Sequence, residues 1–246
     1  MKNYLLTLCF DGTAYHGWQV QPNAVTVQSR LQDAAEQILG VRESVTGCSR
    51  TDARVHADMF CCNLRTEKEI TPEKLQTAFN AVLPRDIAVL SVREVPLGFH
   101  ARYDCTGKAY RYLIVNRAVR DPFFENRALH YPWTLDAEAL HREAQSFLGT
   151  HDFSAFCASK CAVEDKVREI RACSVYRNGD LVEFRVTGNG FLYNMVRIMV
   201  GTLLEIQNGK IAYGELPNIL DSRDRQRAGV TAPAHGLYLH KVYYDI

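Results

Sequence analysis

The chain has 246 residues, of which 47% are hydrophobic and 23% are charged. This balance excludes an intrinsically disordered or low-complexity chain, and no apolar stretch reaches the length needed to cross a bilayer. The net charge of +1 excludes a global field that attracts polyanions, so nucleic-acid binding would depend on local basic patches.

The N-terminal apolar run breaks at Asp11 before any small-residue cleavage site, so we expect a cytoplasmic protein. Its eight cysteines are scattered instead of framing a small secreted domain, which favours reduced thiols. Basic side chains gather in three places, each of which, taken alone, is more typical of a solvated face than of a binding site. These are Arg102 with Lys108 and Arg111, Arg117 with Arg120 and Arg127, and residues 222–227.

The first part of the chain has the periodicity of a βαββαβ unit. Its strands are expected over residues 4–10, 44–49, 57–65 and 87–95. The first helix follows Thr26, a favourable N-cap, and ends at Gly40. The second begins at Thr71 and is ended by Pro84. This order is that of a ferredoxin-like unit, an antiparallel sheet with two helices on one face.

The rest of the chain repeats this rhythm approximately. Extended segments are expected over 108–116, 128–133, 167–177, 181–188 and 237–244, and helices over 136–148 and 191–207. We therefore expect an α+β fold of two ferredoxin-like or RRM-like halves, residues 1–103 and 104–246. They would form a mixed, mainly antiparallel sheet with helices on one face and a central cleft at their seam.

Two loops carry more polar residues and glycines than packing requires. Residues 10–21 form a long irregular connection from strand to helix, and such loops are usually functional, although a packed surface loop is the alternative. The second loop holds one carboxylate, Asp52, among Arg50, Arg54 and His56. A carboxylate among cations stays ionised and can act as nucleophile or base, whereas a structural ion pair explains these residues equally well.

A third segment, residues 189–201, contains Arg197 as its only formal charge in an apolar helix. A buried arginine without a partner costs several kcal/mol, so we expect a carboxylate from elsewhere to meet it. Asp52 is the candidate, and a snorkelling arginine is the alternative. Cys48 with His56 leaves open a thiol nucleophile, a weak signal without geometry.

Together these segments resemble the signature blocks of the TruA family of tRNA pseudouridine synthases, over nearly the whole chain. The blocks are 10–12, 17–19, 26–28, 49–53, 55–57, 99–102, 108–112, 151–153, 191–193, 195–197, 232–234 and 236–238. Several ordered blocks over this length are far more specific than any one short motif.

The resemblance implies a role for each matching residue. Asp52 falls on the catalytic aspartate and Arg50 on the arginine that flips the base. Tyr110 falls on the tyrosine that stacks on the target base, and Arg197 on the arginine that pairs with the catalytic carboxylate. The last assignment agrees with the burial argument above.

Two neighbours of Asp52, namely Arg54 and His56, are further expected substrate contacts. The family usually has glycine where this chain has Arg54. If that glycine is needed for a positive φ, Arg54 is strained or the loop is rearranged. If it is not, Arg54 adds a phosphate contact.

The resemblance also implies a homodimer that converts uridine to pseudouridine at tRNA positions 38, 39 and 40, with no cofactor and no metal. Whether Asp52 adds to the base, attacks the sugar or promotes elimination stays open. One rival is a catalytically silent RNA-binding protein with RRM-like halves. Another is a carboxylate-dependent nucleosidase or glycosidase, which would release free uracil.

Overall fold

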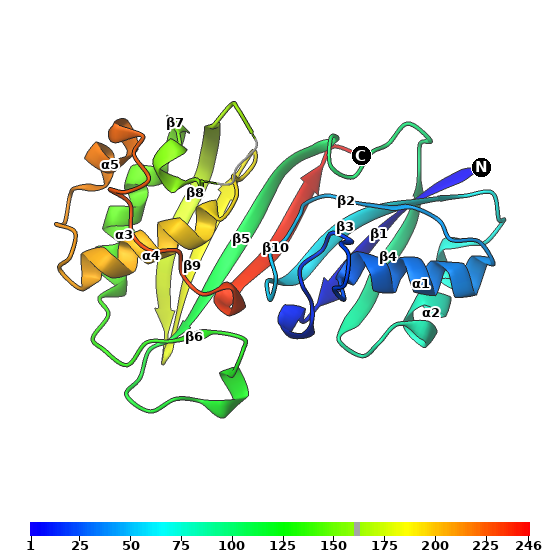
Figure 1. The fold of residues 1–246 in the computed structure, drawn as a ribbon, viewed down its shortest axis with the longest axis horizontal. Helices are drawn as coiled ribbons and strands as arrows, with labels where there is room; N and C mark the ends of the chain where they lie inside the picture. The colour runs from blue at the N-terminus through cyan, green and yellow to red at the C-terminus, as the bar shows by residue number, and fades with distance from the viewer. Residues whose placement is uncertain (160–162) are drawn as a thin grey trace. The chain divides into compact units, whose positions relative to one another are not determined.

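The computed structural model describes residues 1–159 and 163–246, and the chain forms two compact units. The first unit comprises Met1–Thr106 with Tyr238–Ile246, and the second comprises Gly107–Leu237. The α+β class expected from the sequence is confirmed in both units (Figure 1). Each unit is described by itself below.

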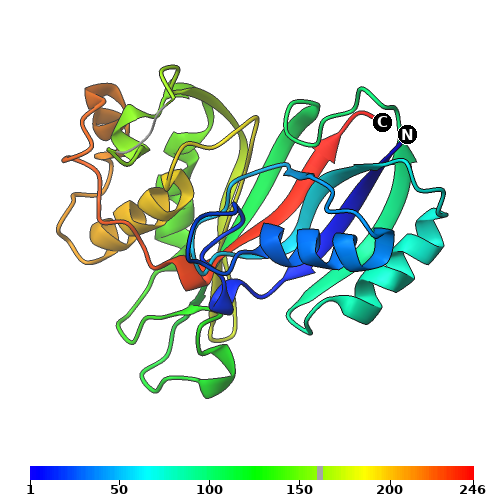
Figure 2. The same cartoon turned by 45° about the vertical axis from the view of Figure 1, so that its right-hand side comes forward.

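The first unit is a ferredoxin-like sheet with two helices. Its elements are β1 (Lys2–Phe10), α1 (Val27–Leu39), β2 (Val45–Gly47), β3 (His56–Thr66), α2 (Pro72–Val82), β4 (Ile87–Val95) and β10 (Leu237–Tyr244). The strand order is β4-β1-β3, with β2 antiparallel to β3 at one end and β10 parallel to β3 at the other. Helices α1 and α2 lie on the same side of this sheet (Figure 2).

The end of the chain joins the first unit, which differs from the expected boundary between 1–103 and 104–246. Residues Tyr238 and Leu239 of β10 pair in parallel with His56 and Ala57 of β3. Because these backbone bonds lie beside the loop that carries Asp52, the last strand supports the first unit. The cleft expected at the seam of the halves stays a prediction.

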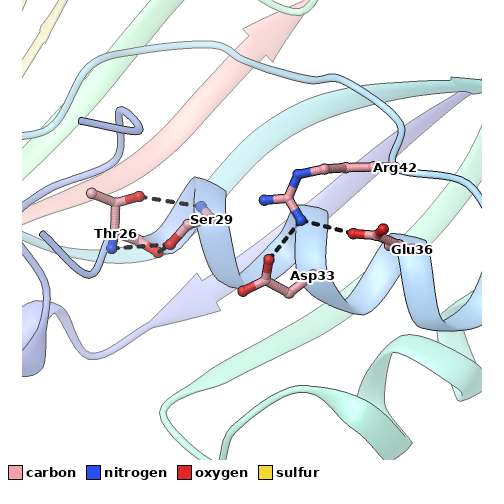
Figure 3. A network of polar contacts seen from close by, with 5 residues as sticks. All are labelled: Thr26, Ser29, Asp33, Glu36 and Arg42. Atoms are coloured by element: carbon pink, nitrogen blue, oxygen red, sulfur yellow. Dashed lines mark hydrogen bonds and ion pairs between the residues drawn. The ribbon is translucent and has the colours of Figure 1, made fainter. Parts of the chain in front are cut away.

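Helix α1 begins where a capping box satisfies its first amide groups. The Thr26 side chain accepts a hydrogen bond from Ser29 N at 3.2 Å, and Ser29 Oγ accepts one from Thr26 N at 3.2 Å (Figure 3). Beyond the helix, Arg42 donates to Asp33 Oδ1 at 2.8 Å and Glu36 Oε2 at 2.9 Å. These exposed ion pairs add little stability, but they hold the segment that follows α1 against the helix before the chain enters β2.

The core of the first unit fills the space between one sheet face and both helices. Register pairs such as Leu8 with Phe60 place their side chains on the same face. The fully buried residues there include Tyr4, Leu6, Leu8, Phe60 and Leu64 from the strands, and Leu31, Ala35, Leu75 and Phe79 from the helices. The alternation read from the sequence therefore places the helices correctly.

The second unit is also a mainly antiparallel sheet with helices, in which β5 and β6 pair in parallel. Its main elements are β5 (Cys105–Val115), β6 (Leu129–His130), α3 (Ala137–Ala144), β7 (Gly149–Asp152), β8 (Val167–Asn178), β9 (Leu181–Gly188), α4 (Met195–Gln207) and α5 (Leu216–Ser222). The order is β5-β9-β8-β7, and β6 pairs with β5. Side chains of α3, α4 and the strands, among them Leu140, Leu203 and Phe184, line one small internal space, so both helices cover the same face.

Several expectations for this unit differ from the structure, and one is the helix expected over 136–148, whose α-helical part is Ala137–Ala144. Helix α4 begins at Met195 instead of residue 191, because Asn194 has a φ of 61° and breaks the helical path. Strand β6 covers only Leu129–His130 of the expected 128–133. Strand β7 and helix α5 were not expected, since each is too short to produce a clear periodicity.

Candidate functional site: the Asp52 loop and its support

Asp52 lies in the connection between β2 and β3, residues 48–55, which we name the Asp52 loop. Backbone bonds fix both ends of this loop: Cys48 N donates to Cys61 O at 2.8 Å, and Val55 N donates to Asp52 O at 3.2 Å. Asp52 is half-buried, whereas Arg50 is exposed. The loop therefore presents a carboxylate and a cation on a backbone held at its base.

A second loop, residues 11–26 between β1 and α1, holds the Asp52 loop on either side of the carboxylate. We name it the strand–helix loop. Trp18 N donates to Thr51 O at 3.2 Å, and Arg54 N donates to Tyr15 O at 3.1 Å. These bonds attach the residues before and after Asp52–Ala53 to one neighbouring backbone. Asp52 therefore does not lie on a free surface turn. Its position is set by the packing and the backbone hydrogen bonds between the two loops.

Glycines make this close approach possible. A Cβ on Gly17, which has a φ of +85°, would lie 2.4 Å from Thr51 O and 3.0 Å from the carbonyl carbon of Asp52. A Cβ on Gly12 would lie 2.1 Å from Val55 O. Real Cβ atoms do not approach so closely, so these two positions require glycine. These two glycines of the strand–helix loop are thus needed for its contact with the Asp52 loop.

An aromatic stack anchors the same contact. Trp18 is buried and stacks on Phe60 of β3, with ring centroids 4.1 Å apart and planes 25° apart. A Cβ on Gly47 would lie 2.5 Å from the Trp18 ring. The tryptophan therefore occupies the space that a side chain at the end of β2 would need.

Arg54 has a φ of +67°, in the left-handed region that favours glycine. This answers the question raised by the departure from the family pattern, because the position does require a positive φ. A residue with a Cβ pays about 1 kcal/mol or more for that conformation. Arg54 is exposed and lies two residues after Asp52.

His56, an expected substrate contact, is only 1% exposed. Its Nδ1 accepts a hydrogen bond from Gly12 N at 3.0 Å, and its ring stacks on Tyr238 at 4.6 Å. Asp11 Oδ1 lies 3.2 Å from the same nitrogen but already accepts from Thr13 N and Thr13 Oγ1. A nitrogen that accepts from an amide carries no proton, so we interpret the Asp11 contact as proximity and not as an ion pair.

The observed contacts of His56 are those of a support between the two loops and β10. Its role toward substrate stays a prediction. The Cys48 thiol considered as a nucleophile is fully buried, an environment in which thiols are inert. The seven cysteines among the described residues form no disulfide, and Cys161 lies outside those residues.

Arg197 lies on α4 of the second unit, half-buried. Its Nε donates to Ala232 O at 2.7 Å, its Nη1 donates to Asn194 Oδ1 at 2.8 Å, and its backbone O accepts from Ala232 N at 3.1 Å. Gly201, whose Cβ would lie 1.7 Å from Val230 O, lets this segment approach the helix. The guanidinium is thus oriented by carbonyl and amide oxygens of its own unit.

Tyr110 lies on β5 of the second unit and is 7% exposed. Its ring meets Phe191 edge to face, with centroids 5.0 Å apart. Tyr112, two residues further along the strand, donates its hydroxyl to Pro233 O at 2.8 Å. Asp52 belongs to the first unit, so its expected pairing with Arg197 and its approach to Tyr110 stay predictions.

Sequence reasoning missed one neighbour of the carboxylate. Thr51 Oγ1 is buried and has no hydrogen-bond partner in the part of the chain that the structure describes. An unpaired buried hydroxyl costs about 1–3 kcal/mol, so its retention next to Asp52 is unusual for a purely structural position. Composition and spacing carry no signal for such a group, since only the folded loop decides which hydroxyls find partners.

Two general properties bear on the partners of the protein. Every helix within residues 1–159 and 163–246 is too short or too polar to span a membrane. Over the same ranges, no three His, Cys, Asp or Glu side chains gather as possible ligands of a metal ion.

Comparison with known proteins assigns this α+β chain to a class, the pseudouridine synthases. The family described as tRNA pseudouridine synthase matches residues 8–104 and 144–245. A protein named tRNA pseudouridine synthase A from Acetivibrio thermocellus is 47% identical, with 99% of this chain and 100% of that protein covered. One of the same name from Clostridium acetobutylicum is 45% identical over the same shares. The chain belongs to the tRNA pseudouridine synthase family.

Among solved structures, a chain in a crystal structure of a Cbf5-Nop10-Gar1 complex matches with a TM-score of 0.38 and 12% identity. The match covers 97% of this chain and 59% of that one. A likeness this loose adds nothing to the family assignment.

Proposed function

We infer that this chain isomerises uridine to pseudouridine in tRNA, with Asp52 as the catalytic carboxylate. Family membership supports the reaction type. One observation supports the residue: the loop that carries Asp52 is clamped by a second loop through contacts that only glycine permits. A turn with a merely structural ion pair needs no such clamp, whereas a reacting group must be held closely in place.

The reaction breaks the bond between C1′ and N1, rotates the uracil and joins C1′ to C5. The proton on C5 is lost and N1 gains one, so the isomerisation needs neither an oxidant nor a group donor. Asp52 can contribute by adding to C6, by attacking C1′ or by promoting elimination to a glycal. All three routes require an ionised carboxylate close to the nucleotide.

A base inside a helical stem cannot reach Asp52, so the nucleotide must be flipped out at a cost of roughly a few kcal/mol. Arg50 is exposed beside Asp52 and is suited to fill the vacated space or hold a phosphate. Tyr110 offers an aromatic face that replaces the lost stacking. We further propose Arg197 as the cation that pairs with Asp52.

The substrate positions proposed are uridines 38, 39 and 40 in the anticodon arm. A site built from stacking and phosphate contacts reads shape and flexibility more than base edges, so neighbouring positions can be treated alike. We also propose a homodimer, by family resemblance. A cytoplasmic location and the lack of a cofactor or metal are part of the same proposal.

The decisive experiment compares Asp52→Ala with Asp33→Ala, a change that removes an α1 carboxylate paired with Arg42 in the same unit. A tRNA transcript labelled in uridine is incubated with each protein, digested and separated by chromatography. Asp52→Ala should form no pseudouridine while binding tRNA within about tenfold of the parent, because phosphate contacts supply most affinity. Asp33→Ala should retain activity.

Each rival gives a different product pattern. A silent RNA-binding protein binds tRNA without turnover, and removing Asp52 changes nothing. A nucleosidase releases free uracil. Appreciable pseudouridine formation by Asp52→Ala would end the assignment of the catalytic residue, and modification confined to another arm of tRNA would overturn the substrate positions.

A further inference from the structure

Tyr15 of the strand–helix loop is bonded at both ends. Its backbone O accepts from Arg54 N at 3.1 Å, next to the proposed catalytic residue. Its hydroxyl donates to Asp86 Oδ1 at 2.6 Å, and the residue is only 4% exposed. A single residue thus connects the Asp52 loop to Asp86, which lies far from it in the sequence.

Asp86 is bonded to the edge of the sheet. Asp86 immediately precedes β4, and its backbone O accepts from Asp11 N at 2.9 Å. Strands β1 and β4 are paired there, since Phe10 lies opposite Ile87. Asp86 therefore fixes the strand–helix loop twice, at its first residue through the backbone and at Tyr15 through the carboxylate.

The Tyr15 hydroxyl remains a donor at all physiological pH values, because burial and then the neighbouring Asp86 carboxylate raise the pKa of Tyr15. Tyr15 and Asp86 also line an open pocket of about 530 Å³ between α1 and the end of α2. Water in this pocket can solvate the carboxylate. Removing the hydroxyl therefore deletes one hydrogen bond without stranding a buried charge.

We propose that Tyr15 is a positioning residue of the isomerisation. Asp86 holds the Tyr15 hydroxyl, and the Tyr15 carbonyl in turn holds the amide of Arg54, two residues after Asp52. This role rests on the proposed function of Asp52. Arg54 is held in a left-handed conformation, and the hydrogen bond from its backbone N–H to Tyr15 O opposes relaxation of the turn. Releasing Tyr15 lets the turn relax and moves the carboxylate, and displacements of about 1 Å can cost on the order of 100-fold in rate.

The test uses Tyr15→Phe with Tyr4→Phe as a matched control. Tyr4 is also fully buried in the first unit, and its hydroxyl donates to Ile70 O at 2.6 Å, away from the Asp52 loop. Both variants lose one tyrosine hydrogen bond, so both should lower the melting temperature by similar amounts. Only Tyr15→Phe should lower kcat, by about tenfold or more, with KM for tRNA unchanged.

The acceptor provides a second arm. Asp86→Asn keeps an oxygen that accepts from Tyr15 and should retain most of the activity, whereas Asp86→Ala should lose kcat as Tyr15→Phe does. The double variant Tyr15→Phe with Asp86→Ala should be no worse than either single variant, because both remove the same bond. If Tyr15→Phe does not fold, Asp86→Ala carries the same test with the tyrosine in place.

A readout independent of activity is amide hydrogen exchange at Arg54, whose N–H is bonded to Tyr15 O. Exchange should accelerate in Tyr15→Phe and remain slow in Tyr4→Phe. Equal kcat and equal Arg54 exchange in both variants would overturn the positioning role. If the parent protein forms no pseudouridine at all, the proposed function fails, while the exchange comparison still decides whether Tyr15 holds the loop.

Discussion

Replacing Gly17 by alanine tests whether the contact between the two loops positions Asp52. Two costs arise. A Cβ at a φ of +85° costs about 1–2 kcal/mol, partly offset by about 0.4–1 kcal/mol because alanine restricts the unfolded chain. The new methyl would also lie 2.4 Å from Thr51 O, about 1 Å closer than the 3.4 Å at which ordinary contact begins.

The clash between the new methyl group and Thr51 O can affect the protein in two ways. If the loops hold their places, overpacking lowers the free energy of unfolding by about 1–3 kcal/mol beyond the backbone cost. If they separate, the Asp52 loop moves by about 1 Å, and the rate of pseudouridine formation falls on the order of 100-fold. Since the struck atoms belong to the backbone of Thr51 and Asp52, we expect the loops to separate and the rate to fall.

Gly40→Ala supplies the matched control. Gly40 has a φ of +79° at the end of α1, and nothing lies within 4 Å of its built Cβ, so this variant carries the backbone cost alone. Urea unfolding gives the free energies, and single-turnover modification of a tRNA transcript gives the rates. If Gly17→Ala matches Gly40→Ala in both measurements, the close approach does not position Asp52 and the reasoning is refuted.

Three further predictions follow from single residues. In urea unfolding, Arg54→Gly should leave the free energy of unfolding unchanged or raise it by up to about 1 kcal/mol, whereas Arg54→Ala should not raise it. The glycine variant should also modify positions 38, 39 and 40 more evenly. A clear loss of stability in Arg54→Gly would contradict this. Arg197→Met should lose activity at neutral pH with part restored at higher pH, because Asp52 would lack its proposed cation; a fully active variant would show that the pair does not exist. Burial raises the pKa of Cys61 from 9.0 to about 11, so the unfolded chain ionises first and stability falls as pH rises from 9 to 11. Urea unfolding of Cys61→Ala should show a shallower decline than Cys105→Ala over that range, and equal slopes would count against it.

Elements with strong local signals could be predicted from the sequence almost to the residue. Strand β4 (Ile87–Val95) and strand β9 (Leu181–Gly188) have the expected bounds, and α1 ends at Gly40 in the left-handed conformation typical of a helix C-cap. Helix α4 shows the limit. Its apolar pattern extends to residue 191, but the positive φ of Asn194 delays the start, and no periodicity reports a backbone angle.

For the candidate site, the residue types around Asp52 were readable while their supports were not. The pattern identified the glycines near Trp18 as unusual, yet their contacts join residues more than thirty positions apart in the chain, such as Gly17 and Thr51. His56 illustrates the same limit, because the sequence did not reveal that it is buried against Tyr238 from the far end of the chain, while its expected contact with substrate stays a prediction. Long-range packing decides such cases.

Gly17 and Arg54 share a positive φ, yet only one of them carries a side chain. The difference lies in their surroundings. Arg54 is exposed, so its side chain has room, and the penalty is limited to the conformational energy of the left-handed region, which one hydrogen-bonded turn can absorb. At Gly17 a Cβ would strike the backbone of Thr51 and Asp52, and no rotamer can relieve a clash with the first side-chain atom. A positive φ alone therefore tolerates substitution, whereas a positive φ in contact with another backbone does not. This explains how the chain can depart from the family glycine beside Asp52 while the strand–helix loop keeps its own.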